Sequence, residues 1–100
     1  MHTILILGGG KSAIFLIDFL AKSCQAKDRK LILADLHLAS AQEKLKNQPN
    51  TEASQLDIED SHARQSLIKE ADLVISMLPA FMHPKVAKDC LEFGKHFFSP

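Results

Sequence analysis

Residues 4–13 read Ile-Leu-Ile-Leu-Gly-Gly-Gly-Lys-Ser-Ala, and they carry the clearest structural pattern in the chain. Its four leading apolar residues predict a buried β-strand. Three glycines follow at once, and residues 12–24 have the apolar spacing of a helix. A strand, a glycine turn and a helix start, with the spacing Gly8-x-Gly10-x-x-Ala13, fit a dinucleotide-binding fingerprint whose third place is alanine.

Each small residue of this fingerprint has a physical role. Gly8 can adopt turn angles that a residue with a Cβ resists. Gly10 lets the backbone approach a pyrophosphate, and Ala13 is small enough for the helix to pack on the strand. The first N–H groups of the helix then face an anion at the positive end of the helix dipole. Three glycines also occur in ordinary loops, so the prediction depends on the strand–turn–helix context.

The composition limits the classes of protein to which the chain can belong. It has 100 residues and a formal net charge of zero, which predicts one domain, residues 1–100, and no nucleic-acid surface. The longest apolar run, residues 73–82, is too short to cross a bilayer, and residues 1–3 lack the features of a signal peptide. We therefore expect no membrane partner and a cytoplasmic protein. Cys24 and Cys90 are expected to be buried thiols, and the five histidines show no metal-ligand spacing.

Apolar runs and helical patterns alternate along the chain. Strands are expected over residues 3–7, 31–35, 51–56, 72–78 and from 97, with helices over 12–24, 38–47, 61–70 and from 82 to just before Gly94. Residues 27–30 are expected to form a polar turn. The alternation predicts an α/β domain with a parallel sheet between two helical layers. We expect a Rossmann-type, doubly wound, three-layer αβα fold with strand order 3-2-1-4-5, truncated after the fifth strand, and a ligand at the carboxyl ends of strands one and four.

Acidic residues follow two of the expected strands. Asp35 closes the second strand about twenty residues beyond the glycine loop, where a carboxylate can accept hydrogen bonds from an adenosine ribose. The alternative role for Asp35 is to cap the next helix. After the third strand, Asp57 and Ile58 are candidates to border the adenine, and Asp60 or Ser61 is expected to cap the helix that follows.

The second half of the chain carries a resemblance to a known family. Residues 72–90 read Asp-Leu-Val-Ile-Ser-Met-Leu-Pro-Ala-Phe-Met-His-Pro-Lys-Val-Ala-Lys-Asp-Cys, and Gly-Lys-His follows at 94–96. The Leu-Pro-Ala turn, His-x-x-Val-Ala-x-x-Cys and Gly-Lys-His resemble the saccharopine dehydrogenase family of the glutamate-forming type, also called saccharopine reductase. The glycine stretch and Leu-Asp-Ile-x-Asp at residues 56–60 are similar to that family too. The resemblance covers nearly the whole chain and implies an NAD(P)-dependent oxidoreductase of lysine metabolism.

The resemblance also implies which residues bind the cofactor. The pyrophosphate loop would comprise Gly8, Gly10, Lys11, Ser12 and Ala13; the ribose position Asp35, with Leu36 beside it; the adenine edge Asp57 and Ile58; and the nicotinamide side Met77, Leu78 and Pro79. Ser99 matches the first place of the family's Thr-Ala-Ser-Tyr run and completes this set, although Pro100 replaces the alanine. No residue is assigned a catalytic role, because His83 is expected to begin a helix rather than to act as an acid.

NAD is the expected cofactor, because the carboxylate of Asp35 favours a free ribose 2′-hydroxyl and repels a 2′-phosphate. Relatives that use NADP often place an arginine near this position, whereas Leu36 and His37 follow Asp35 here. Lys11 could approach a phosphate from the glycine loop, which keeps NADP open as the alternative.

We expect the chain to be the N-terminal cofactor-binding piece of a longer enzyme, because a Rossmann-type sheet usually has six strands. The catalytic and dimerisation domain of the family is missing, so the piece alone is expected to be inactive. The full-length protein is expected to be a homodimer that takes a small amino-acid-derived substrate. The alternatives are an NAD(H)-sensing regulatory domain and a related dehydrogenase of another amino-acid-derived substrate.

Overall fold

The computed structural model describes residues 2–8, 13–25 and 28–99, and it confirms the expected alternation of strands and helices. Five parallel strands form one sheet in the order β3-β2-β1-β4-β5. The strands are β1 (His2–Leu7), β2 (Arg29–Asp35), β3 (Thr51–Gln55), β4 (Leu73–Ser76) and β5 (His96–Phe98). The helices are α1 (Ile14–Gln25), α2 (Leu38–Leu45), α3 (Ser61–Glu70) and α4 (His83–Glu92), with a short 3-10 turn, η2 (Ala80–Met82), before α4.

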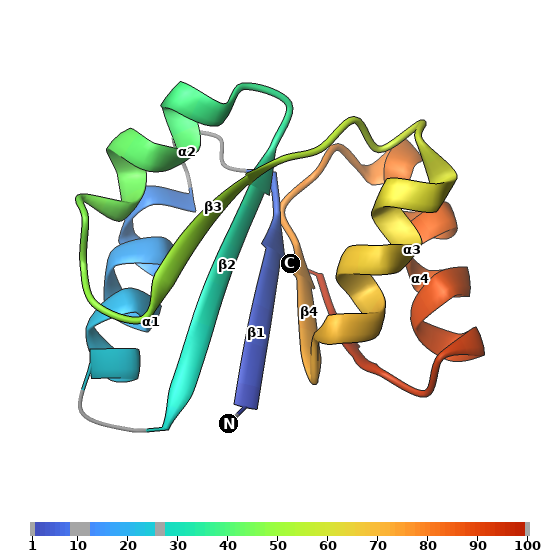
Figure 1. Ribbon diagram of the computed structural model, residues 1–100. Helices are drawn as coiled ribbons and strands as arrows, with labels where there is room; N and C mark the ends of the chain where they lie inside the picture. The colour runs from blue at the N-terminus through green and yellow to red at the C-terminus, as the bar shows by residue number, and fades with distance from the viewer. Residues whose placement is uncertain (1, 9–12, 26–27, 100) are drawn as a thin grey trace.

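The helices cover the two faces of the sheet in pairs. Figure 1 shows α1 and α2 on one face and α3 and α4 on the other, which gives the expected three-layer Rossmann-type architecture. The strand order reverses at β1, since the chain adds β2 and β3 on one side of β1 and then β4 and β5 on the other. Leu7, at the end of β1, is in register with Ala34 on β2 and Ser76 on β4. The carboxyl ends of these three strands therefore meet at one edge, which is the upper edge in Figure 1.

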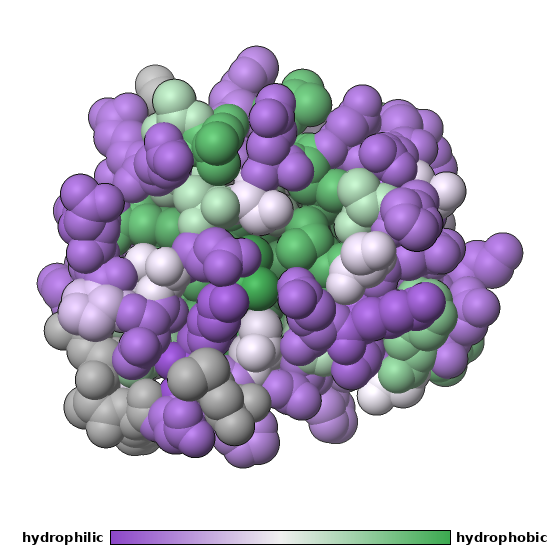
Figure 2. All heavy atoms as spheres, in the orientation of Figure 1, coloured by the Kyte–Doolittle hydropathy of each residue, from purple (hydrophilic) through white to green (hydrophobic). Residues whose placement is uncertain are grey.

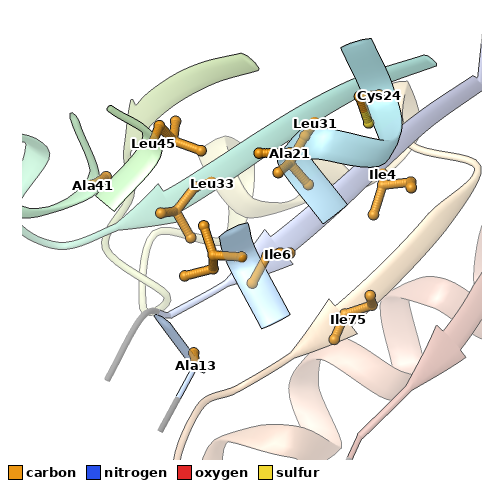
Figure 3. Packing of buried hydrophobic residues seen from close by; sticks show 11 residues of the cluster. Ile4, Ile6, Ala13, Ala21, Cys24, Leu31, Leu33, Ala41, Leu45 and Ile75 are labelled. Atoms are coloured by element: carbon orange, nitrogen blue, oxygen red, sulfur yellow. The ribbon is translucent and has the colours of Figure 1, made fainter. Parts of the chain in front are cut away.

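One half of the core lies between the sheet and helices α1 and α2 (Figure 3). Small residues allow the close approach of α1 that the glycine fingerprint predicts, because Ala13, just before α1, and Ala21 of α1 are fully buried. Ile6 of β1 and Leu33 of β2 are also fully buried. The burial of Ala13 confirms the predicted packing role of the third fingerprint position.

The other half of the core lies under α3 and α4 and includes Val74, Val86 and Cys90. Both cysteines are buried, as expected. Burial raises the pKa of the Cys90 thiol to about 11 and also raises the pKa of the Cys24 thiol, so both thiols stay neutral. None of the helices in the described part of the chain combines the length and the apolar character that crossing a membrane requires.

Several predicted boundaries and faces are wrong. Strand β2 begins at Arg29, so the polar turn before it is shorter than expected, because β2 continues to pair with the start of β1. Strand β4 covers only Leu73–Ser76, since its pairing with β1 ends at Ser76, opposite Leu7. Helix α2 ends at Leu45 because Lys46 adopts left-handed backbone angles. The apolar spacing of α4 would place Leu91 on its inward face, but Leu91 is exposed.

Candidate functional site

The site lies at the carboxyl edge of the sheet, where backbone hydrogen bonds continue the strand pairing into the loops. The N–H of Gly8 donates to the Ala34 carbonyl at 2.9 Å, and the N–H of Met77 donates to the Leu7 carbonyl at 2.8 Å. On the other side of β2, the N–H of Leu56 donates to the Asp35 carbonyl at 2.8 Å. These bonds hold the segments that follow β1, β2, β3 and β4 next to one another.

These segments enclose a cleft of about 480 Å³. Its walls combine apolar side chains with a few carboxylates. Figure 2, in the orientation of Figure 1, shows that the face drawn exposes apolar residues in its middle and polar residues around them. The cleft is lined by Gly8, Ala34, Asp35, Leu36, Leu56, Asp57, Ile58, Glu59, Met77, Leu78, Pro79 and Met82. A concave, mainly apolar cleft with a few placed polar groups is typical of cofactor sites.

Most of the predicted cofactor residues that the structure describes meet in this cleft. They are Gly8, Asp35, Leu36, Asp57, Ile58, Met77, Leu78 and Pro79. Ala13 is instead buried in the core beneath α1, and Ser99 follows β5 without lining the cleft. Gly10, Lys11 and Ser12 lie outside the described residues, so their predicted contacts with the pyrophosphate stay predictions.

Gly8 has the backbone conformation that the fingerprint requires of its first glycine. Its φ is +81°, a region that residues with a Cβ rarely adopt. A methyl group on Gly8 would also lie 3.0 Å from Cδ2 of Leu78, which is tighter than an ordinary van der Waals contact. Glycine is therefore needed here for the turn itself and for the close approach of Leu78 from the loop after β4.

Asp35 ends β2 and lines the cleft, with a half-buried side chain. One carboxylate oxygen, Oδ1, accepts a hydrogen bond from the backbone N–H of His37 at 3.0 Å. His37 is the N-cap residue of α2, and its own side chain makes no capping hydrogen bond. The carboxylate thus orders the entry into α2 while remaining at the wall of the cleft, which is compatible with a ribose contact.

The loop after β3 is built from carboxylates that accept local backbone hydrogen bonds. Oδ1 of Asp57 accepts from the N–H of Glu59 at 2.9 Å. Oδ1 of Asp60 accepts from the N–H of Ala63 at 3.1 Å, so Asp60, rather than Ser61, caps α3. These bonds give the loop a defined shape beside the cleft.

The structure adds residues to the site that sequence patterns did not single out. Ala34, Leu56, Glu59 and Met82 line the cleft together with the predicted set. Glu59 pairs with Lys85 of α4, with a distance of 2.7 Å between Nζ and Oε2. The sequence pointed to Leu56 and Glu59 only as neighbours of Asp57 and Ile58. It gave no signal for Met82, which reaches the cleft from the η2 turn.

The electrostatics of the cleft are acidic among its described lining residues. Asp35, Asp57 and Glu59 line it, and no lysine or arginine is among the described residues that do so. Within the described residues, no group of three or more histidine, cysteine, aspartate or glutamate side chains is placed to hold a metal ion. Positive charge for a phosphate would therefore have to come from backbone N–H groups or from side chains beyond this lining.

Comparison with known families decides between the interpretations of this cleft. Residues 4–99 match the model of the saccharopine dehydrogenase NADP binding domain. The chain belongs to this family. This family supports a nicotinamide dinucleotide as the cofactor, and it supports a dehydrogenase domain over a regulatory sensing domain. The description of the family names NADP, whereas the carboxylate of Asp35 led us to expect NAD. The cleft fits such a group, because Gly8 lines it without a side chain and Asp35 lines it with a carboxylate that can accept hydrogen bonds.

Individual relatives show the same similarity. The chain is 34% identical to an alpha-aminoadipic semialdehyde synthase of Arabidopsis thaliana, over 93% of this chain and 10% of that protein. It is 32% identical to a saccharopine dehydrogenase [NADP(+), L-glutamate-forming] of Schizosaccharomyces pombe, over 96% of this chain and 21% of that protein. Apo saccharopine dehydrogenase (L-Glu forming) of Saccharomyces cerevisiae superposes with a TM-score of 0.87 at 30% identity, over 99% of this chain and 21% of that chain. The chain thus spans a small part of the length of these relatives.

Proposed function

We propose that the chain binds NADP(H) in the cleft as the cofactor domain of a saccharopine dehydrogenase-type oxidoreductase in lysine metabolism. The observation that carries this proposal is the convergence of Gly8, Asp35, Ile58 and Leu78 on one cleft at the point where the strand order reverses. Dinucleotides bind at such a switch point in doubly wound sheets. The family to which the chain belongs supports this choice of cofactor and of reaction.

In this proposal the two halves of the cofactor occupy opposite parts of the cleft. The adenosine half lies against Asp35, Leu36, Asp57 and Ile58, and the nicotinamide half lies against Met77, Leu78 and Pro79. The pyrophosphate passes over Gly8, with Gly10, Lys11 and Ser12 as its proposed partners. The bound cofactor supplies hydride transfer, and the residues of this chain hold and orient it.

The choice of NADP over NAD is part of the proposal. It is supported by the description of the family and by the names of two fungal relatives that specify NADP(+). The carboxylate of Asp35 opposes this choice, because it repels a ribose 2′-phosphate, by about 1 kcal/mol at 4 Å in water. The proposal therefore predicts that wild-type Asp35 reduces the preference for NADP without reversing it.

The test is a calorimetric titration of the chain with NADPH and with NADH. NADPH is expected to bind more tightly, and Asp35→Asn is expected to strengthen NADPH binding about fivefold by removing the repulsion. Glu70→Gln, which removes an exposed charge from α3, is the matched control and should change neither affinity. A wild-type chain that binds NADH more tightly would refute the assignment of NADP, and a chain that binds neither would refute the proposed function.

We extend the proposal to the whole enzyme, because the curated relatives are about five to ten times longer than the segment that matches this chain. We propose that residues 1–100 form the cofactor domain of this enzyme, that other segments of it bind an amino-acid-derived substrate and dimerise, and that this chain alone turns over no saccharopine. Two free, buried thiols suit a reducing compartment such as the cytoplasm. Saccharopine-dependent reduction of NADP by the isolated chain would contradict this division of roles.

A further inference from the structure

A buried ion pair joins α3 to α4, and Figure 1 shows these two helices side by side. Nε of Arg64, on α3, lies 2.6 Å from Oδ2 of Asp89, on α4. Their side chains are only 8% and 4% exposed. Gln65 adds a hydrogen bond from Nε2 to the other carboxylate oxygen of Asp89 at 3.3 Å. A buried pair with these additional bonds holds both side chains in one geometry.

Arg64 also reaches the wall of the cleft. Its Nη1 donates a hydrogen bond of 2.6 Å to the backbone carbonyl of Ile58. Ile58 is buried and lines the cleft beside Asp57, on the side proposed for the adenosine half. Since Asp89 fixes the guanidinium of Arg64, helix α4 is linked through Arg64 to the position of Ile58.

The opposite wall has its own link to α4. Nε2 of His83, the first residue of α4, lies 2.8 Å from the carbonyl oxygen of Leu78, to which it donates a hydrogen bond. The imidazole also makes an edge-to-face contact with the ring of Phe97 on β5, with 6.4 Å between the ring centroids. Leu78 and Pro79 line the cleft on the side proposed for the nicotinamide half.

We propose that α4 positions the two walls of the cleft independently, through the Arg64 hydrogen bond to Ile58 on one side and the His83 hydrogen bond to Leu78 on the other. Arg64, Asp89 and His83 are positioning residues and do not line the cleft. A rigid link holds a wall in the shape that the cofactor needs, so less ordering is required when the cofactor binds. This inference rests on the proposed function, because it assigns one half of the dinucleotide to each wall.

The test compares a dinucleotide with its adenosine half, namely NADP with 2′,5′-ADP, or NAD with AMP if the wild-type chain prefers NAD. Replacing the buried pair by apolar side chains, Arg64→Met with Asp89→Leu, preserves packing but leaves the Ile58 carbonyl without this donor. The double variant is expected to unfold at a similar denaturant concentration and to bind both ligands about tenfold more weakly. Arg64→Lys retains the ion pair but cannot make both contacts, so it should weaken both ligands to a smaller extent.

The His83 variants should give a different pattern. His83→Ala is expected to weaken the dinucleotide about fivefold while the adenosine half binds as it does to the wild type. His83→Gln can still donate a hydrogen bond to the Leu78 carbonyl, so it should restore the affinity. A role in stability alone would weaken both ligands in every variant, in proportion to the loss of stability.

Two results would overturn the inference while leaving the proposed function intact. One is an Arg64→Met/Asp89→Leu variant that binds the adenosine half as tightly as the wild type. The other is a His83→Ala variant that weakens the adenosine half as much as the dinucleotide. A wild-type chain that binds neither dinucleotide overturns the proposed function, and the inference with it.

Discussion

Gly8→Ala should separate the role of the glycine turn in folding from its role in binding the cofactor. Gly8 has a φ of +81°, and an added methyl group would lie 3.0 Å from Cδ2 of Leu78, a residue that lines the cleft. Gly94 offers a matched control, because its φ of +67° is also left-handed and an added methyl group would meet nothing within 4 Å. The two variants share the backbone penalty, and the contact with Leu78 belongs to Gly8→Ala alone.

The expected loss of stability is similar for the two variants. A left-handed backbone costs a residue with a Cβ about 1–2 kcal/mol. Each variant should therefore lower the free energy of unfolding by about that amount, which corresponds to a fall in Tm of roughly 4–16 °C for a domain of this size. In the empty cleft of the Gly8→Ala variant, Leu78 can swing its flexible end away from the new methyl group, so the close contact adds little to this cost.

The two variants should differ in cofactor binding. When a dinucleotide fills the cleft, Leu78 can no longer move away from the methyl group, and overpacking of this kind costs about 1–3 kcal/mol. Gly8→Ala should thus weaken NADPH binding by roughly 5- to 150-fold. Gly94→Ala should bind NADPH as the wild type does.

Urea denaturation and calorimetric titration of the three proteins provide the assay. An equal loss of NADPH affinity in both variants would show that instability alone accounts for the effect. Unchanged affinity in a folded Gly8→Ala protein would refute the assignment of Gly8 to the cofactor cleft.

Three further predictions concern stability. Ser76 is fully buried and its hydroxyl has no hydrogen-bond partner among the described residues, so Ser76→Ala should raise the free energy of unfolding by about 1 kcal/mol; a loss of stability would indicate a bound water or another partner. Asp60→Ala should cost about 1 kcal/mol by removing the cap of α3, with Ser61→Ala as a neutral control, and equal losses would contradict the cap assignment. The N–H of Thr3 donates to Asp72 and lowers the pKa of its carboxyl, so this contact stabilises the fold above the unfolded pKa and is lost as the pH falls through the lower folded pKa. Asp72→Asn should therefore reduce the fall in the free energy of unfolding below about pH 4, and the same pH dependence of stability in both proteins would contradict this.

The order of strands and helices could be predicted from local sequence patterns, because each of these patterns has one main physical cause. Continuous apolar runs predict strands that are buried on both faces, and the glycine turn after residues 4–7 fixes where the first crossover begins. Gly94 follows the last helix with a φ of +67°, as a residue just beyond a helix end is expected to do. Boundaries were less accurate because pairing with a neighbouring strand, rather than composition, decides that Arg29 lies in β2.

The sequence predicted those cleft residues that lie at or just beyond the ends of strands. Asp35, Asp57 and Leu78 were found because parallel strands present their carboxyl ends at the same edge. The supports behind the cleft could not be predicted. Arg64 and Asp89 look like residues of solvated helix faces, and only the packing of α3 on α4 reveals that their charges are buried together. His83 was correctly expected to begin a helix, but its bond to Leu78 depends on the path of the intervening loop.

A calorimetric titration of this chain and of its Gly10→Val variant with NADPH tests whether the cleft binds a dinucleotide. Gly10 is the fingerprint position that lets the backbone approach the pyrophosphate, so a valine there should block the ligand. We expect saturable binding of one NADPH per chain and its loss in a folded Gly10→Val protein. Binding that is unaffected by this substitution, or no binding to the wild-type chain, would contradict the claim that the cleft is a dinucleotide site.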